Sequence, residues 1–207
     1  MKEVFPSPTS TAGEIVLRDA TAADARALAE LIAIAGAGIP EWLWAQMADP
    51  NEDVFDVGTR RAERDEGGFS WTNAIVAETY GSVIGMILGY RLEVEDGSLD
   101  EVPEILRPFL ELERHVPGSW YINAFALYAP WRSRGIGSRL LAAATERAHK
   151  AGCRRMSVQT FSETPRSEAF YIRRGFRRID ARRLPVPSPC RHGGDTLLLL
   201  RDEKSTG

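Results

Sequence analysis

Cysteine is scarce in this sequence, with only Cys153 and Cys190 among its 207 residues. Their spacing matches no metal-binding pattern, so the sequence predicts neither a metal site nor a disulfide framework. So little cysteine is typical of proteins from a reducing compartment. We therefore expect a cytoplasmic protein.

Long hydrophobic segments are missing as well. The longest apolar run, residues 31–39, is far shorter than the roughly 20 residues that cross a bilayer as a helix. Residues 1–12 lack the apolar core of a signal peptide, and we expect them to form a flexible tail. The remaining residues, 13–207, suit a single domain that has no membrane partner.

The sequence also lacks a large charge of one sign. It has 26 Lys and Arg against 29 Asp and Glu, and the net charge of −3 argues against a nucleic-acid partner. The charges are nevertheless unevenly spread. Arginines are concentrated between Lys150 and Arg191, and carboxylates between Glu93 and Glu113. Such asymmetry is compatible with a polyanionic ligand on one side and a cationic ligand on the other.

The hydrophobic periodicity predicts strands and helices along the whole chain. A tight turn at Tyr80 and Gly81 joins two apolar segments into a β-hairpin. The acidic segment, residues 92–118, has apolar residues at helical spacing, whereas residues 49–68 are polar and suit a loop or a frayed helix. The expected strands are 14–18, 73–79, 82–90, 119–128, 155–161, 176–184 and 196–201, and the expected helices follow Thr21 or Asp24 and cover 41–47, 140–151 and 164–174.

This order of elements predicts an α/β protein of the mixed α+β kind, with helices on the faces of a mixed sheet. The chain from Tyr128 to Arg155 leaves one strand, forms a helix and enters the next strand. We expect a right-handed crossover that joins two parallel strands. Pro185, Pro187 and Pro189 mark a loop and not a boundary between domains.

Two glycines lie between an expected strand and the following helix, in residues 132–137 (Arg-Ser-Arg-Gly-Ile-Gly). Gly135 and Gly137 allow positive φ angles and a close approach of the backbone to a ligand. The start of the helix offers free N–H groups and the positive end of its dipole, which favour bound phosphate. Arg132 and Arg134 can add charge-assisted hydrogen bonds. The spacing excludes a P-loop and disfavours a dinucleotide fold, although a G-x-G turn by itself is more often only a structural connection.

Residues 132–137 resemble the Q/R-x-x-G-x-G/A signature of the GNAT N-acetyltransferase superfamily. Residues 169–176 (Ala-Phe-Tyr-Ile-Arg-Arg-Gly-Phe) are similar to the second signature of that family, A-x-Y-x-x-x-G-F. The distance between them leaves room for one helix and one strand, and the resemblance covers residues 120–177. It implies a central mixed, mostly antiparallel sheet with a splayed pair of parallel strands and helices on both faces. It also implies acetyl-CoA as co-substrate and no metal.

The resemblance further implies roles for individual residues. Backbone groups of Phe125, Ala126 and Leu127 are expected to bind the pantetheine arm of acetyl-CoA, and the Leu127 N–H to polarise the acetyl carbonyl. Tyr171 is expected to be the catalytic acid that protonates the leaving thiolate, whereas without the signatures it is better explained as a core aromatic. The other expected cofactor-binding residues are Arg132, Ser133, Arg134, Gly135, Ile136, Gly137 and Ser138 at the pyrophosphate and Thr164 at the pantetheine arm.

Three positions depart from the family pattern. Thr164 stands where the family often has an asparagine, and Gln159 and Asn123 stand where some relatives have carboxylates. An amide side chain cannot accept a proton as a carboxylate can, so the identity of the general base is open. The candidates are His115, Glu113, Glu111 and a chain of water molecules.

These signatures favour an N-acetyltransferase in which an amine attacks the thioester of acetyl-CoA directly. The acceptor is a small molecule or a protein. We expect it to contact residues 39–47, the acidic segment and the loop after Leu184, and the many carboxylates favour a cationic amine. The alternative is a non-catalytic acyl-CoA-binding sensor on the same fold. The protein is expected to be a monomer or a homodimer.

Overall fold

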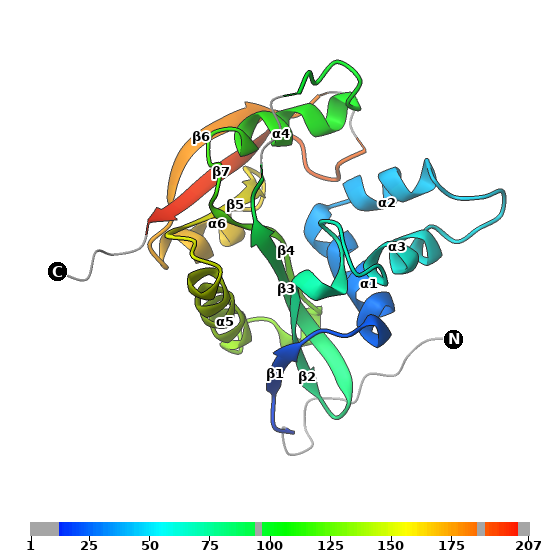
Figure 1. Cartoon of the computed structure of the whole chain (residues 1–207), viewed down its shortest axis with the longest axis vertical. Coiled ribbons are helices and arrows are strands. Elements are labelled where there is room, and N and C mark those ends of the chain that lie inside the picture. The colour runs from blue at the N-terminus through cyan, green and yellow to red at the C-terminus, as the bar shows by residue number, and fades with distance from the viewer. Residues whose placement is uncertain (1–12, 94–96, 186–188, 203–207) are drawn as a thin grey trace.

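The computed structural model describes residues 13–93, 97–185 and 189–202, and the tail expected at residues 1–12 lies outside them. Its strands form one seven-stranded sheet in the order β1-β2-β3-β4-β5-β7-β6 (Figure 1). All neighbouring strands are antiparallel except β4 and β5, which confirms the predicted mixed sheet. The strands are β1 (Val16–Asp19), β2 (Ala74–Thr79), β3 (Ser82–Arg91), β4 (Trp120–Leu127), β5 (Arg155–Phe161), β6 (Arg177–Arg183) and β7 (Asp195–Asp202).

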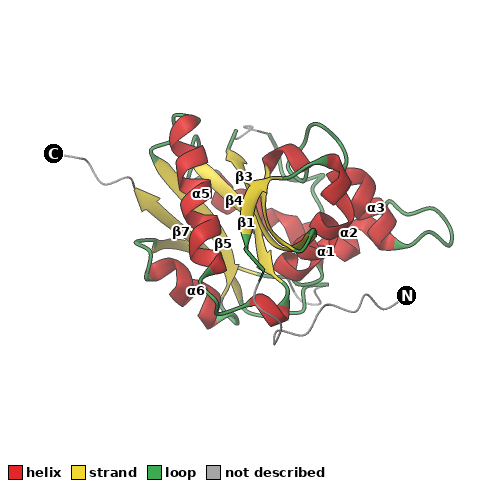
Figure 2. Ribbon diagram, turned by 90° about the horizontal axis from the view of Figure 1, so that it is seen from below, coloured by secondary structure: helices red, strands yellow, loops and turns green. Residues whose placement is uncertain are grey.

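Helices cover both faces of the sheet, with α1, α2 and α3 on one side and α5 and α6 on the other (Figure 2). Because side chains alternate along a strand, Ile75 and Ala77 of β2 belong to the core beneath α5 and α6, whereas Ala74 and Val76 belong to the core beneath α1–α3. The helices are α1 (Ala25–Gly36), α2 (Ile39–Ala45), α3 (Val54–Ala62), α4 (Arg107–Glu113), α5 (Ile136–Lys150) and α6 (Pro165–Ile172).

Helix α3 lies where the sequence predicts a loop or a frayed helix. Its start is capped by the Asp53 side chain, which accepts a hydrogen bond of 2.8 Å from the Phe55 N–H. Such a cap satisfies one of the free N–H groups at a helix start. Val57 and Ala62 are buried in the core that α3 shares with α1. The cap and this buried stripe hold a segment helical whose polar composition alone does not indicate a helix.

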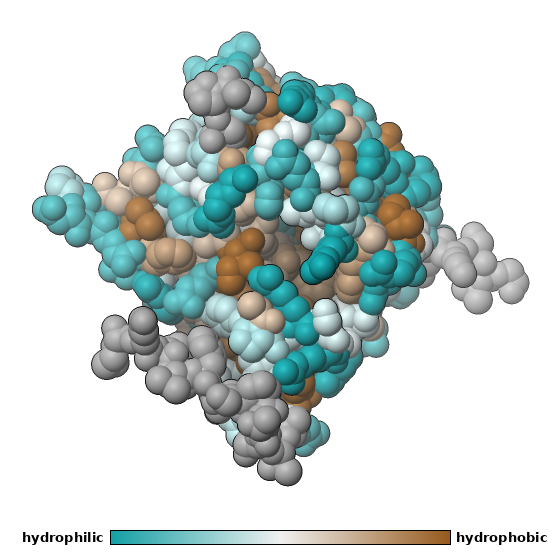
Figure 3. Space-filling view, turned by 180° about the vertical axis from the view of Figure 1, so that it is seen from behind, coloured by the Kyte–Doolittle hydropathy of each residue, from teal (hydrophilic) through white to brown (hydrophobic). Residues whose placement is uncertain are grey.

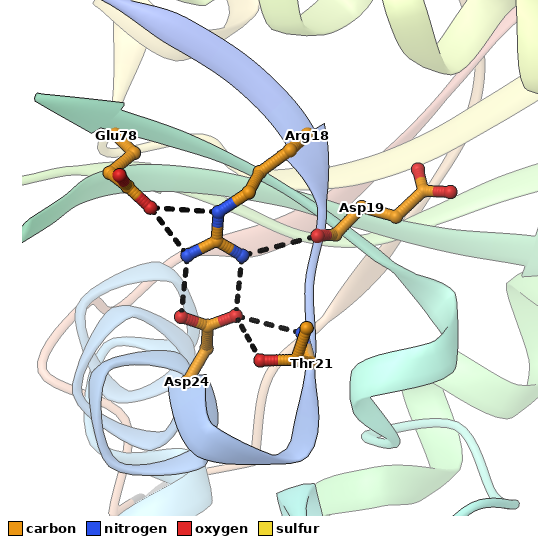
Figure 4. A network of polar contacts seen from close by, with 5 residues as sticks. All are labelled: Arg18, Asp19, Thr21, Asp24 and Glu78. Carbon is orange, nitrogen blue, oxygen red and sulfur yellow. Dashed lines mark hydrogen bonds and ion pairs between the residues drawn. The ribbon is translucent and has the colours of Figure 1, made fainter. Parts of the chain in front are cut away.

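The Arg18 side chain fastens β1 to its neighbours (Figure 4). Two guanidinium nitrogens hydrogen bond to the two Asp24 carboxylate oxygens at 2.7 and 2.9 Å, and Nε donates to Glu78 at 2.7 Å. Asp24 also accepts from the Thr21 backbone N–H at 2.8 Å. These bonds lower the pKa of the Asp24 carboxyl, chiefly through the hydrogen bond from Arg18. The network joins β1, β2 and the turn that leads into α1.

The parallel strands β4 and β5 pair along only part of their length. The pairing runs from Trp120 opposite Met156 to Ile122 opposite Val158 and stops there. Beyond it, β4 continues to Leu127 with β3 as its only partner strand. The sheet is therefore open between β4 and β5, which confirms the expected splayed pair.

An irregularity in β4 lies at the same level as this opening. Leu88 of β3 pairs with Ala124 and the next residue, Gly89, pairs with Ile122, so Asn123 is an extra residue in β4. A β-bulge of this kind interrupts the alternation of side chains. As a result Tyr121, Asn123 and Ala124 all line one pocket on the same face of the sheet.

The face of the molecule opposite to that in Figure 1 is hollowed near its centre, where hydrophobic surface is surrounded by hydrophilic side chains (Figure 3). None of the helices described above has the length and apolar character needed to span a bilayer. Among the residues whose placement is described, no group of three or more His, Cys, Asp or Glu side chains could hold a metal ion.

Candidate functional site

The loop between β4 and α5 presents backbone N–H groups to solvent at the start of α5. Gly135 is the N-cap of this helix with φ of 79°, and Ser133 also has a positive φ of 61°. No side chain caps the helix. The carbonyls three and four residues before Ile136 and Gly137 lie outside the helix, so the N–H groups of these two residues have no partner within it. Helix α5 thus begins four residues before the expected start, and its first turn is part of the loop.

A groove of about 610 Å³ lies between this loop and α6. Of the described residues that line it, four are arginines and none is acidic. A cavity wall with this charge attracts anions. The residues that line this arginine-rich groove are Leu127, Arg132, Ser133, Gly135, Gly137, Ser138, Pro165, Arg166, Ala169, Phe170, Arg173 and Arg174.

Two of the arginines are held in place by other groups of the groove. Arg174 donates to the Phe170 carbonyl at 2.8 Å and to the Ser138 hydroxyl at 2.5 Å, and its guanidinium lies 3.6 Å from the centre of the Phe170 ring. Arg132 donates from Nε to the Leu127 carbonyl at 2.9 Å. These contacts join the loop to α6 and to the end of β4.

The two glycines of the loop differ in the space around them. A Cβ added to Gly135 would have no atom within 4 Å, so this position faces open space at the groove. A Cβ added to Gly137 would lie 3.4 Å from both the Phe125 and Phe170 rings, which is close to the limit of packing. Gly135 therefore leaves the groove open, and Gly137 allows the helix to approach β4.

The opening between β4 and β5 exposes backbone groups of β4. The N–H of Tyr128 donates to the Ile84 carbonyl of β3 at 3.1 Å. Because N–H groups alternate sides along a strand, those of Phe125 and Leu127 point away from β3 and into the opening. They are available to a ligand there, since buried polar backbone groups otherwise require partners.

Tyr171 lies on α6 beside this opening. Its ring is buried, with 5% of its surface exposed, and packs edge-on against Phe125 at 6.4 Å and Phe176 at 5.3 Å between ring centres. Burial raises the pKa of its hydroxyl, so the phenol stays protonated at neutral pH. No described residue hydrogen bonds with that hydroxyl. A buried hydroxyl without such a partner is suited to contact a ligand.

The remaining residues that the sequence predicts for cofactor binding have different surroundings. The side chains of Ala126 and Ile136 are buried in the two cores, and by the same alternation the N–H of Ala126 points toward β3. Arg134 lies over the Trp131 ring at 5.4 Å. The Thr164 hydroxyl donates to the Phe161 carbonyl at 2.8 Å and lies 3.2 Å from the Thr160 hydroxyl.

A second, smaller pocket of about 180 Å³ lies against the other face of the sheet, between α1, α2, α4 and the separating ends of β4 and β5. Most of its lining is hydrophobic, and among the described residues that line it Glu113 alone is charged. The residues that line this apolar pocket are Ile32, Ala35, Gly36, Ile39, Pro40, Leu43, Phe69, Leu106, Phe109, Leu110, Glu113, Tyr121, Asn123, Ala124, Gln159 and Phe161.

The three side chains considered as general bases lie in different surroundings. Burial raises the pKa of the Glu113 carboxyl to about 7, and a hydrogen-bonding interaction with Tyr121 offsets only part of that effect. His115 pairs with Asp180 at 2.9 Å and is 43% exposed. Glu111 pairs with Arg182 at 3.1 Å and is also exposed. Of the three, Glu113 is the one that lines the apolar pocket.

The two amides that replace carboxylates also reach the apolar pocket. Gln159 donates to the Phe109 carbonyl at 3.0 Å and accepts from the Thr196 hydroxyl at 3.2 Å. Asn123 donates to the Gly68 carbonyl at 3.4 Å. Both amides act in the structure as hydrogen-bonding groups of the pocket wall. The sequence carried no signal for the bulge that turns Asn123 toward the pocket, because the bulge depends on pairing with β3.

Comparisons with known proteins agree with this architecture. A model of the acetyltransferase (GNAT) family matches residues 37–176. Among solved structures, a ribosomal-protein-alanine N-acetyltransferase from Brucella melitensis is similar with a TM-score of 0.59 and 21% identity, covering 90% of this chain and 99% of that one. An agmatine N-acetyltransferase variant gives a TM-score of 0.64 at 15% identity, with 91% and 99% coverage. An N-acetyltransferase from Staphylococcus aureus Mu50 gives 0.59 at 16%, with 89% and 99% coverage. At these identities the likeness concerns the fold alone.

Proposed function

Because the chain belongs to the acetyltransferase (GNAT) family, we propose that it moves an acetyl group from acetyl-CoA to an amine, which attacks the thioester directly. The observation that carries the proposal is the opening between β4 and β5, beside which lie both the arginine-rich groove, at Leu127, and Tyr171, which packs against Phe125. One ligand can there reach a phosphate-binding loop and a proton donor together. Holding both reactants in one site removes much of the entropic cost of their encounter.

The residues of the groove fit the cofactor of this reaction. Free N–H groups at the start of α5 and the open space at Gly135 suit a pyrophosphate, since helix N-termini bind phosphate. Ser133, Ser138 and the arginines of the groove add donors. The backbone groups of β4 that face the opening suit the amide groups of a pantetheine arm. Thr164 already donates its own proton to Phe161, so it can offer that arm only an acceptor.

The chemistry that acetyl-CoA supplies is an acetyl group activated as a thioester. In our proposal the Leu127 N–H polarises the carbonyl and stabilises the negative charge that develops on its oxygen. The Tyr171 hydroxyl donates a proton to the leaving sulfur. Its burial keeps the phenol protonated at neutral pH, which is the state that a proton donor needs.

The rival proposal is an acyl-CoA sensor without catalytic activity. A measurement of thiol release from acetyl-CoA in the presence of a panel of amines separates the two, with mass spectrometry of the products. We expect thiol release that depends on the amine and a product heavier by one acetyl group. Tight binding of acetyl-CoA without amine-dependent release across the whole panel would instead support the sensor.

A further inference from the structure

The apolar pocket lies where an acceptor could meet the acetyl group. Its wall includes Tyr121 and Asn123 of β4 and Gln159 and Phe161 of β5, so it spans both strands at the point where they separate. The arginine-rich groove includes Leu127 at the end of the same opening. The two cavities therefore approach one opening in the sheet, the groove from the side of α5 and α6 and the pocket from the side of α1 and α2.

The composition of the pocket describes what it can hold. Its walls are the hydrophobic side chains of α1, α2 and α4, among them Ile32, Leu43 and Phe109. A volume of about 180 Å³ is below the roughly 300–1,000 Å³ of pockets that take drug-sized ligands. A hydrophobic body of a few carbons suits such a space, whereas a polycation would lose its hydration without gaining partners there.

Glu113 is the polar exception in this apolar surrounding. It is half-buried at the end of α4, and Figure 1 shows that helix at one end of the molecule, with α2 nearby. A buried carboxylate without a basic partner is costly, so such a group marks a place for a cation or a proton. It lines the pocket beside Tyr121 of β4, so its carboxylate can receive the amine end of a ligand whose hydrophobic body fills the pocket.

We propose that the apolar pocket binds the acceptor as a small primary amine with a hydrophobic body, and that Glu113 binds its ammonium group and removes its proton. This inference rests on the proposed acetyl transfer. It identifies Glu113 as the general base, a role that the amide side chains of Gln159 and Asn123 cannot fill.

The reaction then balances as follows. Glu113 takes one proton from the ammonium group and leaves a neutral amine. The amine nitrogen attacks the carbonyl carbon of the thioester, the C–N bond forms and the C–S bond breaks. The sulfur receives a proton from Tyr171, which regains one from the amine nitrogen through solvent, and Glu113 releases its proton to solvent. The products are the amide, the free thiol and one proton.

Charged groups around Glu113 leave it as the titrating residue of the pocket. Tyr90 of β3 and Tyr121 of β4 face it, and the pKa values of both are raised by burial, so both stay neutral. From β6, Asp180 and Arg182 pair with His115 and Glu111. Residues four apart lie on the same face of a helical turn, so positions 111 and 115 face one way and position 113 faces another. From α2, Glu41 pairs with Arg191 at 3.0 Å.

A series of linear amines from propylamine to hexylamine, with 2-phenylethylamine, tests the pocket. We expect kcat/KM to rise roughly fourfold with each added methylene until the pocket is full, because each buried CH₂ favours binding by a constant amount. Spermidine and a peptide with an N-terminal alanine serve as polar probes and should be poor acceptors. Acetylation of these two with no transfer to the hydrophobic amines would overturn the inference and leave acetyl transfer standing. No amine-dependent thiol release from any probe would instead contradict the proposed function.

Glu113→Gln tests the carboxylate, with Glu111→Gln as the matched control on the same helix. With hexylamine, Glu113→Gln should lower kcat/KM at least tenfold and leave the KM for acetyl-CoA unchanged. Wild type and Glu111→Gln should show a rise of kcat/KM with pH centred near 7, and Glu113→Gln should lack that rise. Wild-type rates with an unchanged pH profile in Glu113→Gln would remove this residue from the reaction.

Discussion

At the scale of single residues, burial decides what each polar group of this site can do. Tyr171 is buried and Glu113 is half-buried, and burial raises the pKa of each. For the phenol the result is a proton donor that stays protonated at neutral pH. For the carboxyl it is a group near pH 7 that can both take and release a proton. Two side chains with opposite tasks are thus produced by the same physical effect.

Replacing Tyr171 by phenylalanine isolates the role of its hydroxyl. The ring contacts with Phe125 and Phe176 remain, and the hydroxyl has no partner among the described residues that could be left unsatisfied. We expect kcat to fall by about 10²- to 10³-fold, as for loss of one proton donor. Affinity for acetyl-CoA, measured by calorimetry, should barely change. A variant that turns over at the wild-type rate would show that the tyrosine is a core aromatic only.

At the scale of elements, the site depends on how strands and helices end. The loop before α5 and the short pairing of β4 with β5 each leave backbone groups without partners. Elsewhere in a fold such groups would be a cost, since buried polar groups need hydrogen bonds. Here they lie at a groove, where a ligand can satisfy them.

Gly135→Glu should abolish the increase in melting temperature that acetyl-CoA causes in the wild type. A bound ligand stabilises the native state by mass action, and the new carboxylate would fill the open space of the loop and repel phosphate. Gly152→Glu is a matched control at the other end of α5. Gly152 has a φ of 73° and open space around it, so it carries the same backbone strain and the same added charge. Thermal shifts that are equal in the two variants would show that the loop does not bind the cofactor.

The ion-pair network that joins β1, β2 and the start of α1 should make the fold sensitive to acid. Arg18 lowers the pKa of Asp24 in the folded state, so the pair stabilises the fold above the unfolded pKa near 3.8 and ceases to do so as pH falls through the lower folded value. Asp24→Asn should cost about 1–2 kcal/mol at neutral pH, between the values for exposed and buried pairs.

Urea unfolding at pH 7 and pH 3 measures this difference. The free energy of unfolding that Asp24→Asn loses relative to the wild type should be smaller at pH 3 than at pH 7. Asp56→Asn removes an exposed partner of Arg26 and should change stability little at either pH. A deficit of the same size at both pH values would mean that packing, and not the ion pair, explains it.

At the scale of the whole molecule, the ionised Glu113 carboxylate in the apolar pocket lowers the stability of the folded protein. The folded state raises the pKa of Glu113 from about 4.5 to about 7. Between these values the native protein keeps a proton that the unfolded chain has released. The free energy of unfolding should therefore fall as pH rises from about 4.5 through 7.

Glu113→Gln should remove that dependence on pH. The variant should match the wild type near pH 4 and be more stable than the wild type at pH 8.5, as measured by urea unfolding. Glu111→Gln should behave as the wild type, because its carboxylate is exposed. Parallel stability curves for wild type and Glu113→Gln would show that Glu113 is solvated in the folded protein.

Much of this fold could be predicted from the sequence, because local patterns carry it. Hydrophobic periodicity indicated the strands and most helices, and two glycines before a helix indicated the loop at the groove. These features depend on residues close together in the chain. The exception was α3, because its polar composition does not indicate a helix although the segment forms one that is capped and has a buried stripe.

The tertiary structure alone decided how the apolar pocket is built. The bulge at Asn123 exists because β4 pairs with β3, and it turns Tyr121, Asn123 and Ala124 toward one pocket. Glu113 meets these residues because α4 packs on the same face of the sheet. His115 and Glu111 have the same local sequence context but pair with β6 instead. The sequence indicated the groove because each of its two segments, residues 127–138 and 165–174, carries a local pattern, although tertiary packing brings the two segments together. Long-range packing also selected which carboxylate lines the apolar pocket.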